Sequence, residues 1–156
     1  TYYYKRHPLS KEEEKTYGAE YLPLEKLLAV CDIISLHLPV TEETKGMCDK
    51  NFFKKMKEGA YFVNTSRGEL VEDQALIHAL GSGKLTMAAL DTLSHEPVQK
   101  DHILLRQPEE IQNKLLFSPH IGGITASSFR RGYAAIWENV GRITKGEKPV
   151  NVVNGL

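Results

Sequence analysis

The chain has 156 residues, enough for one compact domain with a hydrophobic core and too few for two full ones. Hydrophobic residues make up 41% of it and charged residues 26%, as in ordinary globular proteins, so the composition does not indicate disorder. The 20 basic and 20 acidic residues balance, which gives no electrostatic reason to expect nucleic acid or an anionic membrane as a partner.

Strand-like and helix-like segments alternate along the chain. The predicted strands are 2–5, 19–22, 33–36, 60–64, 87–90 and 115–117. Helices are predicted after Ser10, Pro23 and Asp49, the last closed by Gly59, then over 73–80 and 126–145, with a helical turn near 108–110 and an extended tail from 148 to 156. This order predicts βαβ units: a Rossmann-type, doubly wound parallel sheet covered by helices on both faces.

The last predicted helix has an apolar stripe. Tyr133, Ile136, Trp137 and Val140 recur at helical spacing, which predicts a packed face.

Cysteine use and hydropathy bear on location. Cys31 and Cys48 are the two cysteines, and they form no CxxC pair, which favours a reducing compartment over a disulfide scaffold or a zinc site. No apolar run approaches the ~18 residues of a membrane-spanning helix, and the charged start lacks a signal-peptide core. We therefore expect a cytoplasmic protein with no membrane partner and no metal site.

Functional side chains follow the predicted strands. In open α/β sheets the ligand lies beyond the carboxyl ends of the strands. The polar, charged or loop-forming residues at those ends are Lys5, Arg6, Pro39, Thr65, Arg67, Asp91, Glu96, His120 and Gly122. We expect them to line one edge of the sheet.

Several ordered runs resemble the D-isomer-specific 2-hydroxyacid dehydrogenases. They are VNTSRGELV (63–71), GKL (83–85), ALD (89–91), SPHIGG (118–123) and DIISLHLPVTEET (32–44). The resemblance extends over nearly the whole chain. The opening Arg6-His7-Pro8 is similar to the NADPH-using glyoxylate/hydroxypyruvate reductase branch.

The resemblance implies three catalytic residues, and the chemistry of 2-oxo acid reduction agrees with each. Arg67 would bind the substrate carboxylate and polarise its carbonyl, because a guanidinium offers planar bidentate recognition that an ammonium lacks. His120 would donate the proton, since imidazole titrates near neutral pH. Glu96 would pair with His120, orienting the ring and stabilising its protonated form.

The same resemblance implies the cofactor contacts. Asp91 would lie at the nicotinamide end, and Pro39, Thr65 and the backbone of Gly122 would line the cofactor. NAD-preferring members carry an acid after the second strand, where this chain has Lys5 and Arg6. Because cations attract a 2′-phosphate that a carboxylate would repel, NADP(H) is favoured, with NAD(H) as the alternative.

Each of these residues also has an ordinary structural interpretation. Arg67 could be a surface ion-pair residue, His120 a satisfied buried histidine, and Glu96 an unremarkable loop acid before a proline. Lys5 and Arg6 could be a solvated strand end. A metal site at His95, Glu96 and His102 is disfavoured, because their spacing fits no helical ligand pair and no cysteine joins them.

One expected motif is missing from the sequence. No G-x-G-x-x-G occurs, and Gly81-Ser82-Gly83 follows a helix and is predicted to be a C-cap turn. The strand that should precede the motif lies centrally, between the strands at 2–5 and 33–36, so without it the sheet should split. The chain also starts at Thr1, with a strand already under way. We therefore expect a fragment: 1–147 a partial dinucleotide-binding domain, and 148–156 a return segment towards a substrate domain that is not included.

These observations predict an oxidoreductase that transfers a hydride between a nicotinamide cofactor and a small 2-oxo or 2-hydroxy acid, such as glyoxylate or hydroxypyruvate. We expect a homodimer, and we expect this piece alone to be inactive. Two alternatives stay open: an NAD(P)-sensing, corepressor-like binding protein, and an inactive truncated paralogue.

Overall fold

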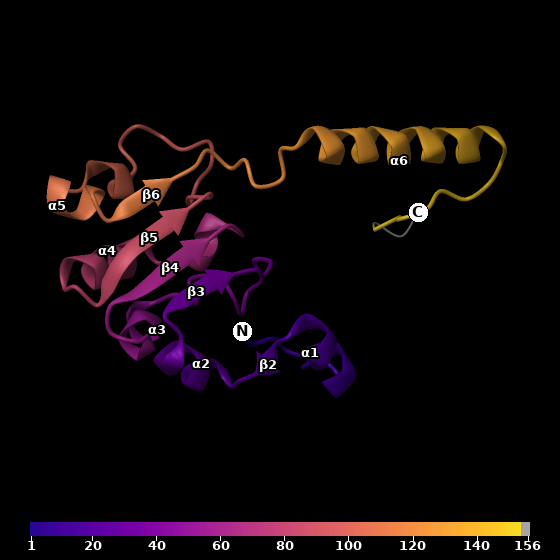
Figure 1. Ribbon diagram of the computed structural model, residues 1–156. Coiled ribbons are helices and arrows are strands. Elements are labelled where there is room, and N and C mark those ends of the chain that lie inside the picture. The colour runs from indigo at the N-terminus through magenta and orange to yellow at the C-terminus, as the bar shows by residue number, and fades with distance from the viewer. Residues whose placement is uncertain (154–156) are drawn as a thin grey trace. The chain divides into compact units, whose positions relative to one another are not determined.

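The computed structural model describes residues 1–153 and divides into two compact units, Thr1–His120 and a second that begins at Ile121 (Figure 1). The first unit contains, in chain order, β1 (Tyr2–Tyr3), α1 (Lys11–Tyr17), β2 (Glu20–Tyr21), α2 (Leu24–Val30), β3 (Ile33–Leu36), α3 (Lys50–Lys55), β4 (Ala60–Asn64), η1 (Gly68–Leu70), α4 (Asp73–Gly81), β5 (Leu85–Leu90), η2 (Ile103–Arg106), α5 (Glu109–Gln112) and β6 (Leu115–Phe117). The helix of the second unit is α6 (Ala126–Thr144). The predicted alternation of strands and helices is confirmed.

The main sheet has four parallel strands in the order β3-β4-β5-β6. Its register aligns the last residue of each strand: Leu36 pairs with Asn64, Asn64 with Leu90, and Leu90 with Phe117. The segments that follow the four strands therefore all start from the same edge of the sheet, as the sequence predicts.

The strands β1 and β2 form a separate, two-stranded parallel sheet. In residues 1–153 no ladder joins this sheet to β3, so β3 is an edge strand of the larger one. This division is the split that the missing glycine-rich motif predicts.

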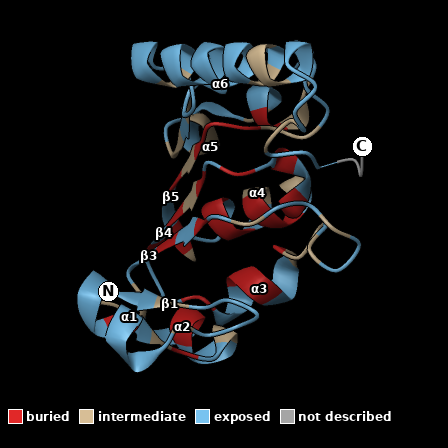
Figure 2. Cartoon of the chain, turned by 90° about the vertical axis from the view of Figure 1, so that its right-hand side faces the viewer, coloured by how far each residue is buried: buried red, intermediate tan, exposed pale blue. Residues whose placement is uncertain are grey.

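The hydrophobic core lies on one face of the main sheet, under α2, α3 and α4. Phe52 and Phe53 from α3 meet Phe62 from β4 edge to face, with ring centroids 6.4 and 5.2 Å from Phe62. Figure 2 shows buried residues on α3, α4 and the strands. On the opposite face, Ile33 and Leu116 are each 62% exposed. Within residues 1–120 the core-forming helices therefore pack on one face of the main sheet, and the covering of its other face stays a prediction.

Local hydrogen bonds explain where the helices begin. Ser10 and Glu13 form the reciprocal capping box of α1, and the side chain of Asp49 accepts the N–H of Phe52 at the start of α3, at 2.7 Å. The predicted end of α3 at Gly59 is wrong. The helix ends at Lys55, because Met56 is already extended, and Gly59 (φ 74°) lies in the turn before β4.

The apolar stripe of α6 is exposed. The helix is amphipathic as predicted, but it has no buried residue, and Tyr133, Ile136, Trp137 and Val140 are all exposed. Within the described part of the second unit nothing covers this face, so the predicted packing stays a prediction: an amphipathic pattern marks the face suited to packing without specifying the surface that covers it. In the tail, Asn139 bonds both the N–H and the C=O of Val150, and residues 154–156 lie outside the described part. No helix in residues 1–153 is long and apolar enough to cross a membrane.

Candidate active site

The segment after β4 presents Arg67. Asn64 is fully buried, and its side chain accepts the N–H of Ser66 at 3.0 Å and donates to the C=O of Arg67 at 2.8 Å. These bonds fold the chain into a tight turn. The guanidinium of Arg67 is on the surface, where Nη1 donates to the C=O of Ser66 at 2.7 Å.

Ser66 joins this turn to the end of β3. Its hydroxyl donates to the C=O of Leu36 at 2.8 Å and accepts the N–H of Leu38 at 3.1 Å. Pro39 therefore follows a backbone segment that is tied to the Arg67 turn. Sequence reasoning assigned no role to Asn64 or Ser66. The signal was present in the N-x-S spacing, since Asn side chains commonly bond the backbone two residues on.

Gly68 brings the segments after β4 and β5 into direct contact. A Cβ atom on Gly68 would lie 1.9 Å from the backbone carbon of Leu93 and 2.1 Å from the nitrogen of Ser94. Real side chains do not occupy such space, so this position requires glycine. Arg67 is thereby fixed beside the segment that carries Glu96.

Glu96 and His120 form the central pair of the site. Oε2 of Glu96 lies 2.5 Å from Nδ1 of His120, and Oε1 accepts the N–H of Leu93 at 3.1 Å. The backbone N–H of His120 donates to the C=O of Asp91 at 2.8 Å. The two side chains are 33% and 45% exposed. Because Nδ1 faces Glu96, Nε2 is the ring nitrogen oriented for a substrate.

Asp91 is buried at the end of β5. Its Oδ1 accepts the hydroxyl of Ser118 at 2.5 Å, and its backbone N–H donates to the C=O of Asn64 at 2.9 Å. It therefore contacts the ends of both neighbouring strands.

The remaining predicted residues fall into three places. Thr65 and Pro39 are exposed at the edge that carries Arg67, and the C=O of Pro39 accepts the hydroxyl of Thr44 at 2.8 Å. Lys5 and Arg6 follow β1 in the separate two-stranded sheet, where both are exposed and Arg6 lies 3.9 Å from Glu43. Gly122 belongs to the second unit, and its role stays a prediction.

The candidate site is thus an open edge of the sheet. Two hollows, of about 430 and 440 Å³, lie elsewhere, beside α1 and between α3 and α4. We place the site at the sheet edge, because neither hollow is lined by Arg67, Glu96 or His120.

Comparison with known proteins identifies similar sequences. The family described as D-isomer specific 2-hydroxyacid dehydrogenase, NAD binding domain, matches residues 1–122. The chain is 40% identical over 141 residues to a glyoxylate reductase from Korarchaeum cryptofilum, covering 90% of this chain and 41% of that protein. It is 38% identical over 137 residues to a hydroxypyruvate reductase from Blautia hydrogenotrophica, covering 88% and 41%.

A solved structure has the same fold. The apo form of D-mandelate dehydrogenase from Rhodotorula graminis matches with a TM-score of 0.84 at 33% identity, covering 99% of this chain and 44% of that one. The chain therefore spans less than half the length of these relatives. The predicted Rossmann-type α/β class and the predicted family resemblance are both confirmed.

Proposed function

Because the chain belongs to the D-isomer specific 2-hydroxyacid dehydrogenase family, we propose that its protein reduces a small 2-oxo acid to the 2-hydroxy acid, with glyoxylate or hydroxypyruvate as the substrate. The observation that carries this proposal is the Glu96–His120 hydrogen bond at the sheet edge that also presents Arg67. The named relatives support the substrate class, since two are a glyoxylate reductase and a hydroxypyruvate reductase.

Each of the three side chains has a separate task in this proposal. Arg67 binds the substrate carboxylate through two parallel N–H···O bonds and draws electron density from the adjacent carbonyl. His120 gives its Nε2 proton to the carbonyl oxygen as the C–H bond forms, leaving a neutral ring at the end of the step. Glu96 keeps the imidazole oriented through its hydrogen bond to Nδ1.

The family's domain binds a nicotinamide dinucleotide, and the residues present fit the two ends of such a molecule. Two exposed cations, Lys5 and Arg6, suit a phosphate, and the buried carboxylate of Asp91 suits the polar carboxamide of a nicotinamide. Pro39, Thr65 and the backbone of Gly122 would line the cofactor. When bound, the reduced nicotinamide supplies the hydride for the carbonyl carbon.

We assign NADP(H) as the preferred cofactor on the strength of Lys5 and Arg6. Glu43 lies 3.9 Å from Arg6, so an incoming 2′-phosphate would replace an exposed and weak ion pair. An Arg6→Ala variant should raise KM for NADPH on the order of 10-fold and leave KM for NADH unchanged. An equal change in KM for NADPH and for NADH would refute the preference for NADP(H).

The catalytic assignment is tested on the native protein that contains this chain, assayed for NAD(P)H oxidation with glyoxylate and with hydroxypyruvate. His120→Gln and Arg67→Lys should each lower kcat/KM by about 10²–10⁴-fold. Lys100→Ala, on an exposed side chain, is the matched control and should keep wild-type activity. Full activity in Arg67→Ala or His120→Ala would refute the mechanism. The homodimer and the cytoplasmic location stay predictions, the first open to sedimentation analysis.

A further inference from the structure

A second hydrogen-bonded cluster lies next to the candidate site and is not used in the proposed reaction. It consists of Asp73, the first residue of α4, with Ser94 and His102 from the segment between β5 and η2. Ser94 Oγ lies 3.1 Å from Asp73 Oδ2 and 3.2 Å from His102 Nε2. The side chains of His102 and Asp73 are only 8% and 19% exposed.

The partners fix the direction of each hydrogen bond. The N–H of Leu104 donates to Nδ1 of His102 at 3.3 Å, so Nδ1 carries no proton and Nε2 must carry it. Nε2–H then donates to the Ser94 hydroxyl, which donates in turn to the Asp73 carboxylate. Burial raises the pKa of Asp73, and the hydrogen bond from Ser94 opposes that shift.

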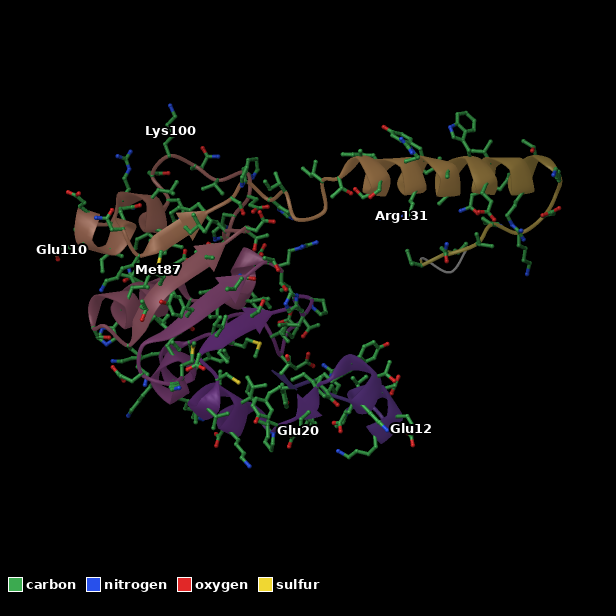
Figure 3. The ribbon with its side chains drawn as sticks, viewed as in Figure 1. Glu12, Glu20, Met87, Lys100, Glu110 and Arg131 are labelled. Atoms are coloured by element: carbon green, nitrogen blue, oxygen red, sulfur yellow. The ribbon has the colours of Figure 1, made fainter. Side chains whose placement is uncertain are left out.

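The cluster closes the base of an excursion from the sheet. Ser94 and His102 are eight residues apart in sequence yet share a hydrogen bond. The residues between them leave the sheet, with Lys100 on the outside and pointing away (Figure 3). Glu96 lies on this excursion, two residues beyond Ser94. The backbone of Ser94 also packs closely against Gly68, so this residue has close contacts through both its side chain and its main chain.

We propose that Asp73, Ser94 and His102 are positioning residues that hold Glu96 against His120. The inference rests on the proposed function only for its kinetic consequence, because the Glu96–His120 contact itself is geometric. Loss of the cluster would free the excursion at its base. The Glu96 carboxylate would then sample positions away from the imidazole, and a displacement of about 1 Å is enough to cost a large factor in rate.

His102 also has a purely structural role. Two substitutions separate this role from its hydrogen bond to Ser94. It caps η2 through Nδ1. Asparagine places its Oδ1 near the position of Nδ1, so His102→Asn keeps the cap and loses the link to Ser94. Glutamine places its amide nitrogen near the position of Nε2, so His102→Gln keeps that link and loses the cap.

The test uses the native protein with ¹⁵N-labelled histidine, in wild type and in His102→Asn, His102→Gln, Ser94→Ala and Glu96→Gln. Ring ¹⁵N shifts of His120 report its protonation and hydrogen bonding at a fixed pH. Circular dichroism confirms that each variant is folded. We expect His102→Asn and Ser94→Ala to move the His120 signals towards those of Glu96→Gln and to lower kcat about 10-fold with KM for the cofactor unchanged. His102→Gln should stay close to wild type in both measurements.

The outcomes distinguish this inference from the proposed function. Wild-type His120 signals in His102→Asn, with the change confined to His102→Gln, would show that capping is the task of His102 and would overturn the positioning role. If Glu96→Gln alters the His120 signals but leaves kcat unchanged, the positioning role stands and the catalytic task proposed for Glu96 fails.

Discussion

At the scale of single residues, Gly68 links the segments that carry Arg67 and Glu96. Its missing side chain lets two backbone segments touch where a Cβ would lie 1.9 Å from a carbonyl carbon. The overlapping atoms belong to the backbone, which cannot rotate away as the end of a long side chain could. A methyl group at this position must therefore move the segment that carries Arg67 relative to the segment that carries Glu96.

We expect Gly68→Ala to reduce kcat/KM at least 10²-fold and to lower Tm, because the overlap displaces Arg67 or Glu96. Gly132→Ala is the control, because Gly132 lies in α6 and a Cβ atom there would have no neighbour within 4 Å. It should be neutral to activity and stabilise by up to about 1 kcal/mol. Assay of kcat/KM and thermal melting check both. Wild-type activity in Gly68→Ala would show that the contact does not set the site geometry.

Thr92 has a hydroxyl that is buried without a hydrogen-bond partner in the described residues. Valine has the same shape and no polar group to desolvate, so Thr92→Val should stabilise by about 1 kcal/mol. Thr86, which lies in β5, donates its hydroxyl to the C=O of Gly59 at 2.7 Å. Thr86→Val should therefore lose stability instead. Denaturant unfolding measures the free energy of unfolding of both variants. Destabilisation by Thr92→Val would mean that the Thr92 hydroxyl has a hydrogen-bond partner in solution.

Sequence alone identified the residues whose chemistry is distinctive at a strand end. Arg67, Glu96 and His120 were predicted because a cation, an acid and an imidazole follow predicted strands and because the runs that carry them resemble the D-isomer-specific 2-hydroxyacid dehydrogenases. Asn64 and Ser66 were not assigned a role, because their function depends on which backbone groups lie nearby. The requirement for Gly68 and the pairing of Ser94 with His102 depend on contacts between distant segments, and no local pattern encodes these.

At the scale of elements, the two-stranded sheet and α1 are joined by one buried acid. Glu14 accepts hydrogen bonds from Lys11 at 2.6 Å, the Tyr3 hydroxyl at 3.1 Å and the N–H of Tyr21 at 3.1 Å. Its carboxylate therefore links α1 to β1 and β2. Lys11 above all, with the hydrogen bonds from Tyr21 and Tyr3, lowers the pKa of Glu14.

A carboxyl group whose pKa is lowered by folding stabilises the folded state above its unfolded pKa, and this stabilisation is lost as pH falls through the folded pKa. Glu14→Gln should therefore lower Tm at pH 7, and its difference from wild type should shrink below about pH 4. Glu12→Gln, on the exposed side of the same helix (Figure 3), is the control and should have little effect. A Tm difference for Glu14→Gln that does not change with pH would contradict the linkage.

The sequence predicted the bounds of several strands more accurately than the end of α3 or the packing of helices on the sheet. The strands 33–36, 60–64 and 115–117 were predicted to the residue, because short apolar runs between turn signals have few alternatives. The end of α3 was misplaced, because Gly59 serves the turn before β4. The prediction that helices cover the second face of the sheet came from the general rule for parallel sheets. No pattern of residues in this chain supports or opposes it.

At the scale of the whole molecule, each of the two units carries an exposed apolar surface. In the first unit it is the open face of the sheet, with Ile33, Tyr61, Met87 and Leu116. In the second it is the stripe on α6. Large exposed apolar surfaces are uncommon on isolated soluble domains. Whether each surface is exposed in solution can be measured on the 156-residue chain.

Trp137 reports on the α6 stripe directly, since it is the single tryptophan of the chain and is 68% exposed. In the 156-residue chain at low concentration, its emission should resemble that of tryptophan in water, and acrylamide should quench it efficiently. Covering the stripe would shift the emission to shorter wavelength and reduce quenching, because the indole would leave water for an apolar contact. The same measurement at rising concentration tests whether copies of the chain associate through this face. A blue-shifted, quencher-resistant emission in dilute, monomeric chain would contradict the exposure of α6.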